Sequence, residues 1–266
     1  IAAGVLALAF LRKDDSRLLA VAVRLAAGGA ACLSLAFGLR WAIWRLVPMT
    51  TLPDSVNMLV FFSTLAMLYL FRKPNLYPLA SFYLPPLAIL CFISGAVAHT
   101  YFFTAPRALP GVPLAIHVGL AFLAYAHFFL AAMTSAAYLC QAQRLKRHNT
   151  KGLFHRLPAL EQLDQTLVQL VNGGYPLFLI TLLLGGGWAY AERDLLGPHW
   201  FLAPKVFLSF VMALFYTIVQ VQRRRGRLRG QKLAQVMFSG FVLLLVLYVA
   251  LMLAQLRNYN FWGTGV

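Results

Sequence analysis

The feature that most constrains this chain is a series of seven long apolar runs, each close to the length of a helix that crosses a bilayer. Crossing the hydrocarbon layer takes about 20 mostly apolar residues. The runs are Leu18 to Val47, Ser55 to Phe71, Leu79 to Phe103, Leu114 to Cys140, Leu167 to Gly187, Phe201 to Val221 and Leu233 to Leu256. We therefore expect an all-α, polytopic transmembrane helix bundle, with residues 1–266 forming a single integral membrane domain.

A shorter apolar stretch, Ile1 to Leu11, precedes the first full run. Because it lacks an initiator Met and is too short to span, we interpret it as the end of a truncated first helix, which gives about eight spans. A signal peptide is the competing interpretation. Neither a basic segment nor a small-residue cleavage site precedes Arg12, and this disfavours a signal peptide.

Basic residues gather in alternate connections between the apolar runs. The chain has 23 Lys and Arg against 7 Asp and Glu, and 61% of its residues are hydrophobic. A nucleic-acid-binding protein carries its basic residues on a solvated face, so we expect no nucleic-acid partner. Short cytoplasmic loops retain Lys and Arg. The predicted location is the cytoplasmic (inner) membrane, with a basic, amphipathic cytoplasmic loop at residues 141–166 and membrane lipid as a partner.

The opposite, outer side collects tryptophan and histidine. In this topology all five tryptophans fall there, namely Trp41, Trp44, Trp188, Trp200 and Trp262, and His99, His117 and His199 share their level. An aromatic belt at the interface explains the tryptophans simply, whereas a platform for a flat, apolar ligand is the alternative. Imidazole, indole and guanidinium groups together are the side chains that a haem site uses.

Patterns for other chemistries are missing from the sequence. It contains no phosphate-binding loop, zincin motif, nucleophile elbow or catalytic carboxylate pair. Cys32, Cys91 and Cys140 lie in apolar runs without CxxC spacing, which argues against a disulfide framework, a zinc site and covalently attached haem. All acids lie in loops or at helix ends, which disfavours a proton-coupled transporter. We assign no catalytic residues and do not expect this chain to be an enzyme by itself.

Three stretches carry a family resemblance. Residues 115–139 read AIHVGLAFLAYAHFFLAAMTSAAYL, residues 157–188 read LPALEQLDQTLVQLVNGGYPLFLITLLLGGGW, and residues 48–62 read PMTTLPDSVNMLVFF, with Asp54 where an acid is usual. They resemble the "HV…SYA" helix, the "LP.LE.LD…G.PLLT…G..WA" segment and the "P.TN.YESL.FF" segment of the cytochrome c assembly superfamily. That superfamily contains the CcsA haem-handling proteins and their HemX-like and YpjD-like relatives.

The resemblance implies haem b as a cofactor, presented by an outer-face loop that corresponds to the family's tryptophan-rich WWD motif. In this chain residues 188–205 resemble that region, but they end in GPHWFLAPK where the family has "G.YWSWDPK". The second Trp and the Asp are lost. Complete CcsA proteins imply four histidines, of which only His117 has a match. Leu46 and either Gln220 or Val221 occupy the places of the two intramembrane histidines.

We interpret His117 as the candidate haem-iron ligand, with His99 or His199 as the second ligand. The full set of candidate cofactor-binding residues is His117, His99, His199, Trp188, Trp200, Arg107 and Arg193. His127 lies on the same predicted helix, about 15 Å deeper and roughly 80° around, so it cannot share the iron. We interpret it as a structural histidine that is bonded to a neighbouring helix.

The sequence thus predicts haem handling or an accessory role in cytochrome c biogenesis at the outer face of the membrane. The alternative is a non-catalytic HemX-like or YpjD-like scaffold or regulatory subunit that has lost haem binding, and the missing histidines favour it. Other cytochrome c biogenesis or haem-pathway proteins, within a larger membrane complex, are the expected protein partners. The basic run from Arg223 to Lys232 is suited to contact an acidic partner or anionic lipid.

Overall fold

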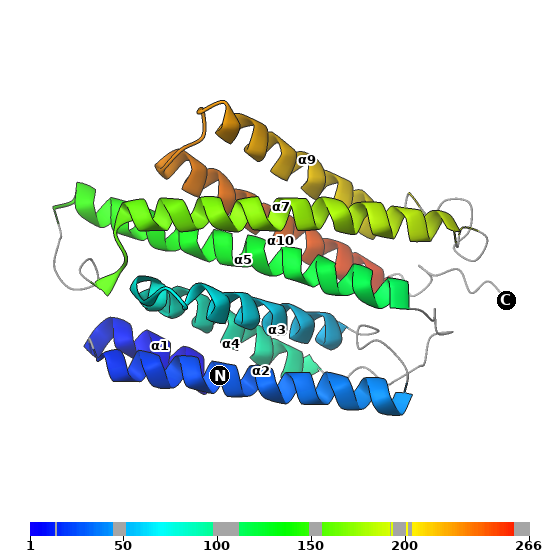
Figure 1. Cartoon of the computed structure of the whole chain (residues 1–266), viewed down its shortest axis with the longest axis horizontal. Coiled ribbons are helices and arrows are strands. Elements are labelled where there is room, and N and C mark those ends of the chain that lie inside the picture. The colour runs from blue at the N-terminus through cyan, green and yellow to red at the C-terminus, as the bar shows by residue number, and fades with distance from the viewer. Residues whose placement is uncertain are drawn as a thin grey trace.

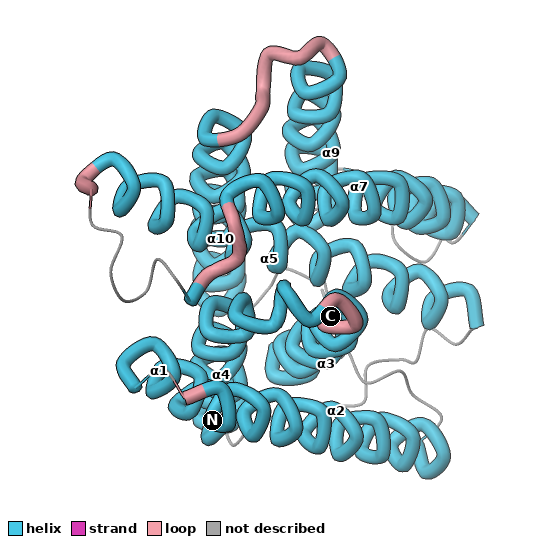
Figure 2. The backbone as a smooth tube through the Cα atoms, turned by 60° about the vertical axis from the view of Figure 1, so that its left-hand side comes forward, coloured by secondary structure: helices cyan, strands magenta, loops and turns pink. Residues whose placement is uncertain are grey.

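A computed structural model of the chain describes residues 1–13, 15–44, 52–97, 112–148, 156–191, 193, 201 and 204–257. Within these ranges every regular element is a helix, so the predicted all-α class is confirmed. The elements are α1 (Ala2–Lys13), α2 (Ser16–Trp44), α3 (Leu52–Leu70), the 3-10 helix η1 (Pro74–Leu79), α4 (Ala80–Val97), α5 (Val112–Lys146), α7 (Leu160–Ala191), α9 (Pro204–Arg224) and α10 (Gln231–Arg257). They form a bundle with α1 and α2 on one side, α9 on the opposite side, and α5 and α7 between them (Figures 1 and 2).

Seven segments of the described chain are helical, long and apolar enough to cross a membrane, which matches the seven full runs of the sequence. The remaining helix, α1, has 12 residues and is about 18 Å long, too short to span. It packs on α2 and α4. Gly4 allows this contact, because a Cβ atom at Gly4 would lie 2.6 Å from the Cβ atom of Ala88.

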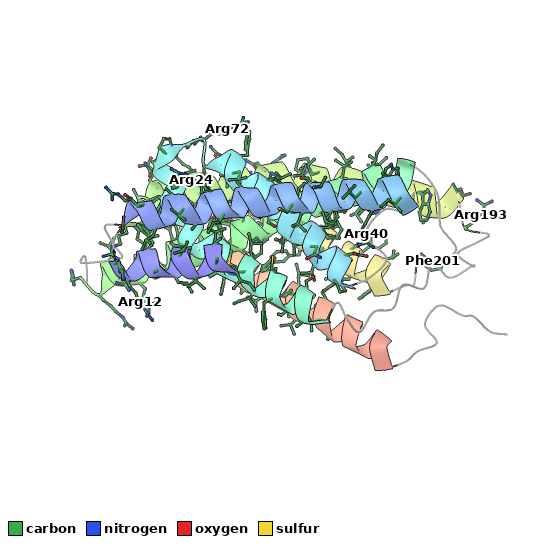
Figure 3. All side chains as sticks on the ribbon, turned by 90° about the horizontal axis from the view of Figure 1, so that it is seen from below. Arg12, Arg24, Arg40, Arg72, Arg193 and Phe201 are labelled. Carbon is green, nitrogen blue, oxygen red and sulfur yellow. The ribbon has the colours of Figure 1, made fainter. Side chains whose placement is uncertain are left out.

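The helices alternate in direction, so that the two ends of the bundle carry different helix termini. Arg12 and Arg72 lie at one end of the bundle, whereas Arg40 and Arg193 lie at the other (Figure 3). We call the first the basic end, where α1, α3, α5 and α9 finish. The second is the Trp end, defined by Trp41 near the end of α2 and Trp188 near the end of α7.

Helix α5 is the central element of the bundle and contacts α3, α4, α7 and α10. Its buried face is largely alanine, and small residues let membrane helices approach closely. At mid-length Phe128 stacks on Tyr216 of α9, with ring centroids 3.6 Å apart. Thr134 and the hydroxyl of Tyr83 on α4 are hydrogen-bonded at 2.7 Å. Aromatic and hydroxyl contacts therefore supply the specificity that apolar burial alone does not give in lipid.

Two polar contacts at the basic end join segments that are far apart in the sequence. Arg156 donates to the carbonyl oxygens of Phe10 at 3.2 Å and of Leu11 at 2.6 Å, so it satisfies the last carbonyls of α1. Asp164 of α7 accepts a hydrogen bond from the backbone N–H of Gly230 at 3.1 Å. Gly230 precedes α10 and has a φ of 53°, in the region that favours glycine. The acid of the LPALEQLD stretch thus anchors the start of α10.

Candidate functional site

His117 lies in the second turn of α5, near the Trp end, and its ring is turned toward α7. The Nδ1 atom of His117 lies 3.0 Å from the carbonyl oxygen of Thr181. A carbonyl oxygen can only accept, so Nδ1 carries the proton in this contact. In the neutral imidazole the lone pair is then on Nε2, the form that ligates metals. The contact fixes both the tautomer and the orientation of the ring.

A glycine makes this contact sterically feasible. A Cβ atom at Gly185 would lie 2.4 Å from Cε1 of His117, so no larger residue fits there without displacing the ring. Thr181 and Gly185 are four residues apart and therefore share one face of α7. The carbonyl of Thr181 is the hydrogen-bond acceptor, and Gly185 provides the space for the imidazole to reach it.

Trp188 continues the same face of α7. Thr181, Gly185 and Trp188 follow the spacing i, i+4, i+7, which places the half-buried Trp188 about one turn beyond Gly185 toward the Trp end. Gly186 and Gly187 lie on other faces of α7, where added Cβ atoms would meet nothing within 4 Å. The site therefore combines an oriented imidazole, a glycine that makes room for it, and an indole ring.

The structure does not bring Arg193 into this group. Its side chain is exposed, its guanidinium lies 4.6 Å from the ring centroid of Tyr190, and it donates to the Tyr190 carbonyl oxygen at 3.4 Å. Figure 3 shows it at the extreme of the Trp end. The other predicted residues, His99, Arg107, His199 and Trp200, lie outside the described residues, and their roles stay predictions.

His127 faces α7 ten residues further along α5. Its Nδ1 atom donates to the carbonyl oxygen of Leu123 on its own helix, at 2.8 Å. Helix α7 contributes two glycines that make room for this ring. Cβ atoms at Gly173 and Gly174 would lie 3.1 Å and 2.8 Å from atoms of His127. The hydrogen bond that we expected to a neighbouring helix is thus made within α5.

Gln220, one of the two residues in the place of an intramembrane histidine, is occupied by structural contacts. Its amide nitrogen donates to the side-chain oxygen of Asn172 on α7 at 3.3 Å. Its side-chain oxygen accepts from Nε and Nη2 of Arg223 at 3.1 and 2.9 Å. These contacts link α7 to α9, so the polar atoms of Gln220 are engaged in helix packing.

At the Trp end, Arg40 of α2 forms an ion pair with Asp54 of α3, and a second contact joins Nη2 and Oδ2 at 3.3 Å. Asp54 is buried, whereas 37% of the Arg40 side chain is exposed. Arg40 is therefore directed to a carboxylate of the chain itself, and this pairing explains the acid of the PMTTLPDSVNMLVFF stretch.

Replacing Asp54 with alanine is expected to lower the free energy of unfolding by about 1–2 kcal/mol, because it removes the partner of a half-exposed cation and leaves a buried gap. Unfolding of the purified protein in mixed micelles measures this change. Glu161→Ala is the matched control, because Glu161 is exposed on α7 and exposed substitutions usually cost less than about 0.5 kcal/mol. Equal losses in the two variants would contradict the assignment.

Thr181 and Gly185 are the site residues that the sequence interpretation missed. The only local signal for them is the run of three glycines directly before Trp188. Within the described part of the chain, no three His, Cys, Asp or Glu side chains converge as a metal cluster would require.

The arrangement defines a polytopic helical membrane protein with an oriented histidine near one end of its bundle. The family model for cytochrome c assembly proteins matches residues 49–256, most of the chain. The chain therefore belongs to the cytochrome c assembly protein family, as the resemblance of its motifs indicated.

Individual relatives agree with this assignment. Protein HemX of Brevibacillus brevis is 35% identical over 133 residues, covering 50% of this chain and 48% of the relative. Protein HemX of Bacillus subtilis (strain 168) is 33% identical over 150 residues, covering 56% and 52%. Cytochrome c biogenesis protein CcsA of Guillardia theta is 25% identical over 257 residues, covering 89% and 81%. The matches to the two HemX proteins span about half of their length. No solved structure matches the chain significantly.

Proposed function

We propose that this protein handles haem in cytochrome c biogenesis, at the Trp end of its bundle, and that this end faces outward from the cytoplasmic membrane. The observation that carries the proposal is the His117 contact. A carbonyl oxygen of α7 holds Nδ1 at 3.0 Å, which leaves Nε2 as the ligating atom. The name of the Guillardia theta relative and the family assignment support the biological setting.

The residues present fit one face of a haem group. His117 would ligate the iron through Nε2, and Trp188 offers an aromatic face for the macrocycle. Gly185 leaves the space that the imidazole needs beside α7. Bound haem would supply a coordinated iron centre for transfer to an apocytochrome, while the protein orients and retains it.

The outward orientation rests on charge. Lys and Arg are retained in cytoplasmic loops. Basic residues gather at the end of the bundle opposite the site, where they end or follow helices: Arg12, Lys13, Arg72, Lys73, Arg144, Lys146, Arg223 and Arg224. In this orientation haem-pathway or other cytochrome c biogenesis proteins would meet the chain on either side of the membrane, within a larger complex.

The test is a visible absorption spectrum of protein purified in mild detergent from haem-replete cells. We expect a stoichiometric Soret band that shifts on reduction, and we expect His117→Ala to remove it because the iron loses its ligand. His127→Ala is the matched control, since it removes a histidine of the same helix that also faces α7. That variant should keep the band.

A second candidate function, a scaffold or regulatory subunit without haem, is favoured by Gln220. The side chain of Gln220 is hydrogen-bonded to Asn172 and Arg223. A complete haem-handling relative would need a histidine at this position. Colourless wild-type protein whose spectrum is unchanged by added hemin would replace the haem proposal with this one. A band of equal intensity in wild type and His117→Ala would reject His117 as the ligand.

A further inference from the structure

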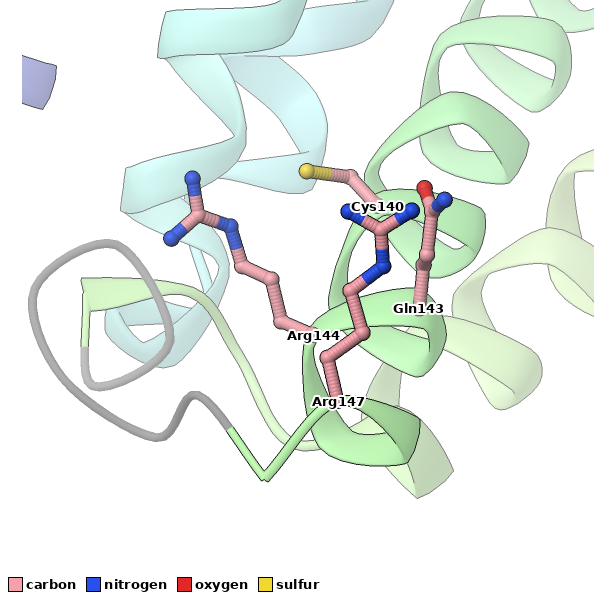
Figure 4. Close-up of a pocket in the computed structure, with 4 residues that line it drawn as sticks. All are labelled: Cys140, Gln143, Arg144 and Arg147. Carbon is pink, nitrogen blue, oxygen red and sulfur yellow. The ribbon is translucent and has the colours of Figure 1, made fainter.

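A hollow of about 240 Å³ lies at the basic end, against the last two turns of α5. Among the described residues it is lined by Cys140, Gln143, Arg144 and Arg147. Their spacing of i, i+3, i+4, i+7 places them on one face of the helix. In Figure 4 both arginine side chains run back toward the level of Cys140, and the amide of Gln143 lies beside Arg147. Two guanidinium groups and an amide thus border one hollow.

The described part of the chain supplies no carboxylate for these two cations. The described acids of the basic end have other contacts: Asp15 accepts from the N–H of Arg17, Glu161 from Gln165, and Asp164 from Gly230. Cations at a helix C-terminus are favoured by the helix dipole. The helix dipole favours the positive charge but provides no hydrogen-bond acceptors for the N–H groups of the two guanidinium groups. The geometry of these N–H groups matches the oxygens of a phosphate.

The position of the hollow along α5 indicates that it lies at the membrane surface. Helix α5 has 35 residues, which makes it about 52 Å long. Because the hydrocarbon layer is only about 30 Å thick, its last turns extend into the headgroup layer. The hollow, though open, is several times larger than the roughly 30 Å³ that one water molecule occupies. It therefore lies where lipid phosphates are concentrated and has room for a phosphate group.

We propose that Arg144 and Arg147, with Gln143, form a binding site for the phosphate of an anionic phospholipid at the basic end. The guanidinium groups bind the phosphate oxygens and Gln143 donates its amide N–H. Cys140 contributes no bond to the phosphate, but its thiol lies inside the same hollow. A bound headgroup therefore covers it, which makes the rate of thiol labelling a local reporter of occupancy.

The experiment uses the full chain in lipid nanodiscs, with Cys32→Ser and Cys91→Ser so that Cys140 is the sole thiol. Maleimide labelling of Cys140 is compared in pure phosphatidylcholine, in phosphatidylcholine with phosphatidylglycerol, and in phosphatidylcholine with millimolar inorganic phosphate. We expect phosphatidylglycerol to slow labelling on the order of tenfold, and inorganic phosphate to leave the rate unchanged, because the lipid is delivered at high local concentration. Equal protection by inorganic phosphate would overturn the lipid assignment.

A charge-matched pair of variants tests which arginines are responsible. Arg144→Gln with Arg147→Gln should abolish the protection and remove one phosphatidylglycerol from the lipids retained in native mass spectrometry. Arg224→Gln with Arg225→Gln removes the same charge from exposed residues at the end of α9 and should change neither. If both pairs of variants lose the protection of Cys140 equally, the arginines attract the anionic surface diffusely and the proposed site is wrong. Protection that persists without Arg144 and Arg147 would also overturn the site.

Discussion

A Gly185→Ala variant is expected to bind hemin about 10- to 100-fold more weakly than the wild type, the usual effect of disturbing the group that orients a metal-ligating histidine. The added Cβ atom would lie 2.4 Å from Cε1 of His117, and the ring must move away from the carbonyl of Thr181. The same crowding should lower the free energy of unfolding by about 1–3 kcal/mol. Hemin titration and unfolding in mixed micelles measure the two effects.

Gly186→Ala is the matched control, because the next residue makes the same chemical change where a Cβ atom meets nothing within 4 Å. Helix propensity alone should then stabilise the protein by up to about 1 kcal/mol. If Gly185→Ala lowers the free energy of unfolding and Gly186→Ala raises it, the contact with His117 is the cause of the difference. If both variants bind hemin as tightly as the wild type, the orientation of His117 has no part in haem binding.

Replacing Phe128 with alanine is expected to lower the free energy of unfolding by about 3–5 kcal/mol. Phe128 is 1% exposed, stacks on Tyr216 of α9 and contacts the ring of Phe178 on α7 edge-on. Lipid cannot enter so central a position, so the alanine variant keeps a cavity. The stack joins α9 to α5. The measurement is equilibrium unfolding, with Phe210→Ala on the exposed face of α9 as the control.

Replacing Tyr216, whose ring stacks on Phe128, is expected to change the free energy of unfolding in the opposite direction. The hydroxyl of Tyr216 is buried and has no hydrogen-bond partner among the described residues. Tyr216→Phe keeps the stack and removes an unsatisfied polar group, so it should raise the free energy of unfolding by about 1 kcal/mol. A loss of stability in this variant would mean that an ordered water or another group binds the hydroxyl in the folded protein.

Much of this fold could be predicted from the sequence because a membrane leaves few alternatives. The seven apolar runs became seven helices because the length of a span and the need to satisfy its backbone internally fix both element type and number. Element ends were harder to predict. Residues 141–146 continue α5 and residues 160–166 begin α7, although their polar composition indicated a loop. Polar residues continue a helix readily once it leaves the hydrocarbon.

The geometry of the candidate site was harder to predict from the sequence than the fold. His117 and Trp188 could be identified singly, since each residue type and its level in the membrane are visible in the sequence. Their shared surroundings could not be predicted, because the contact of His117 with Thr181 depends on the relative axial position and rotation of α5 and α7. Such register is decided by close packing at positions such as Gly174 and Gly185, which have no distinct hydropathy signal. The resemblance to known relatives identified the family and left this geometry open.

The contact between Arg156 and the end of α1 has a consequence for biosynthesis. The donor and its acceptor carbonyl at Phe10 are separated by 146 residues. At typical elongation rates the ribosome needs roughly 7 to 30 s to synthesise that length. During this interval the last carbonyls of α1 face the membrane surface without their final donor, and α2 through α5 are inserted first. Helix α1 thus receives this contact only after α2 to α5 have been translated, so the packing of its last turn is completed late in synthesis.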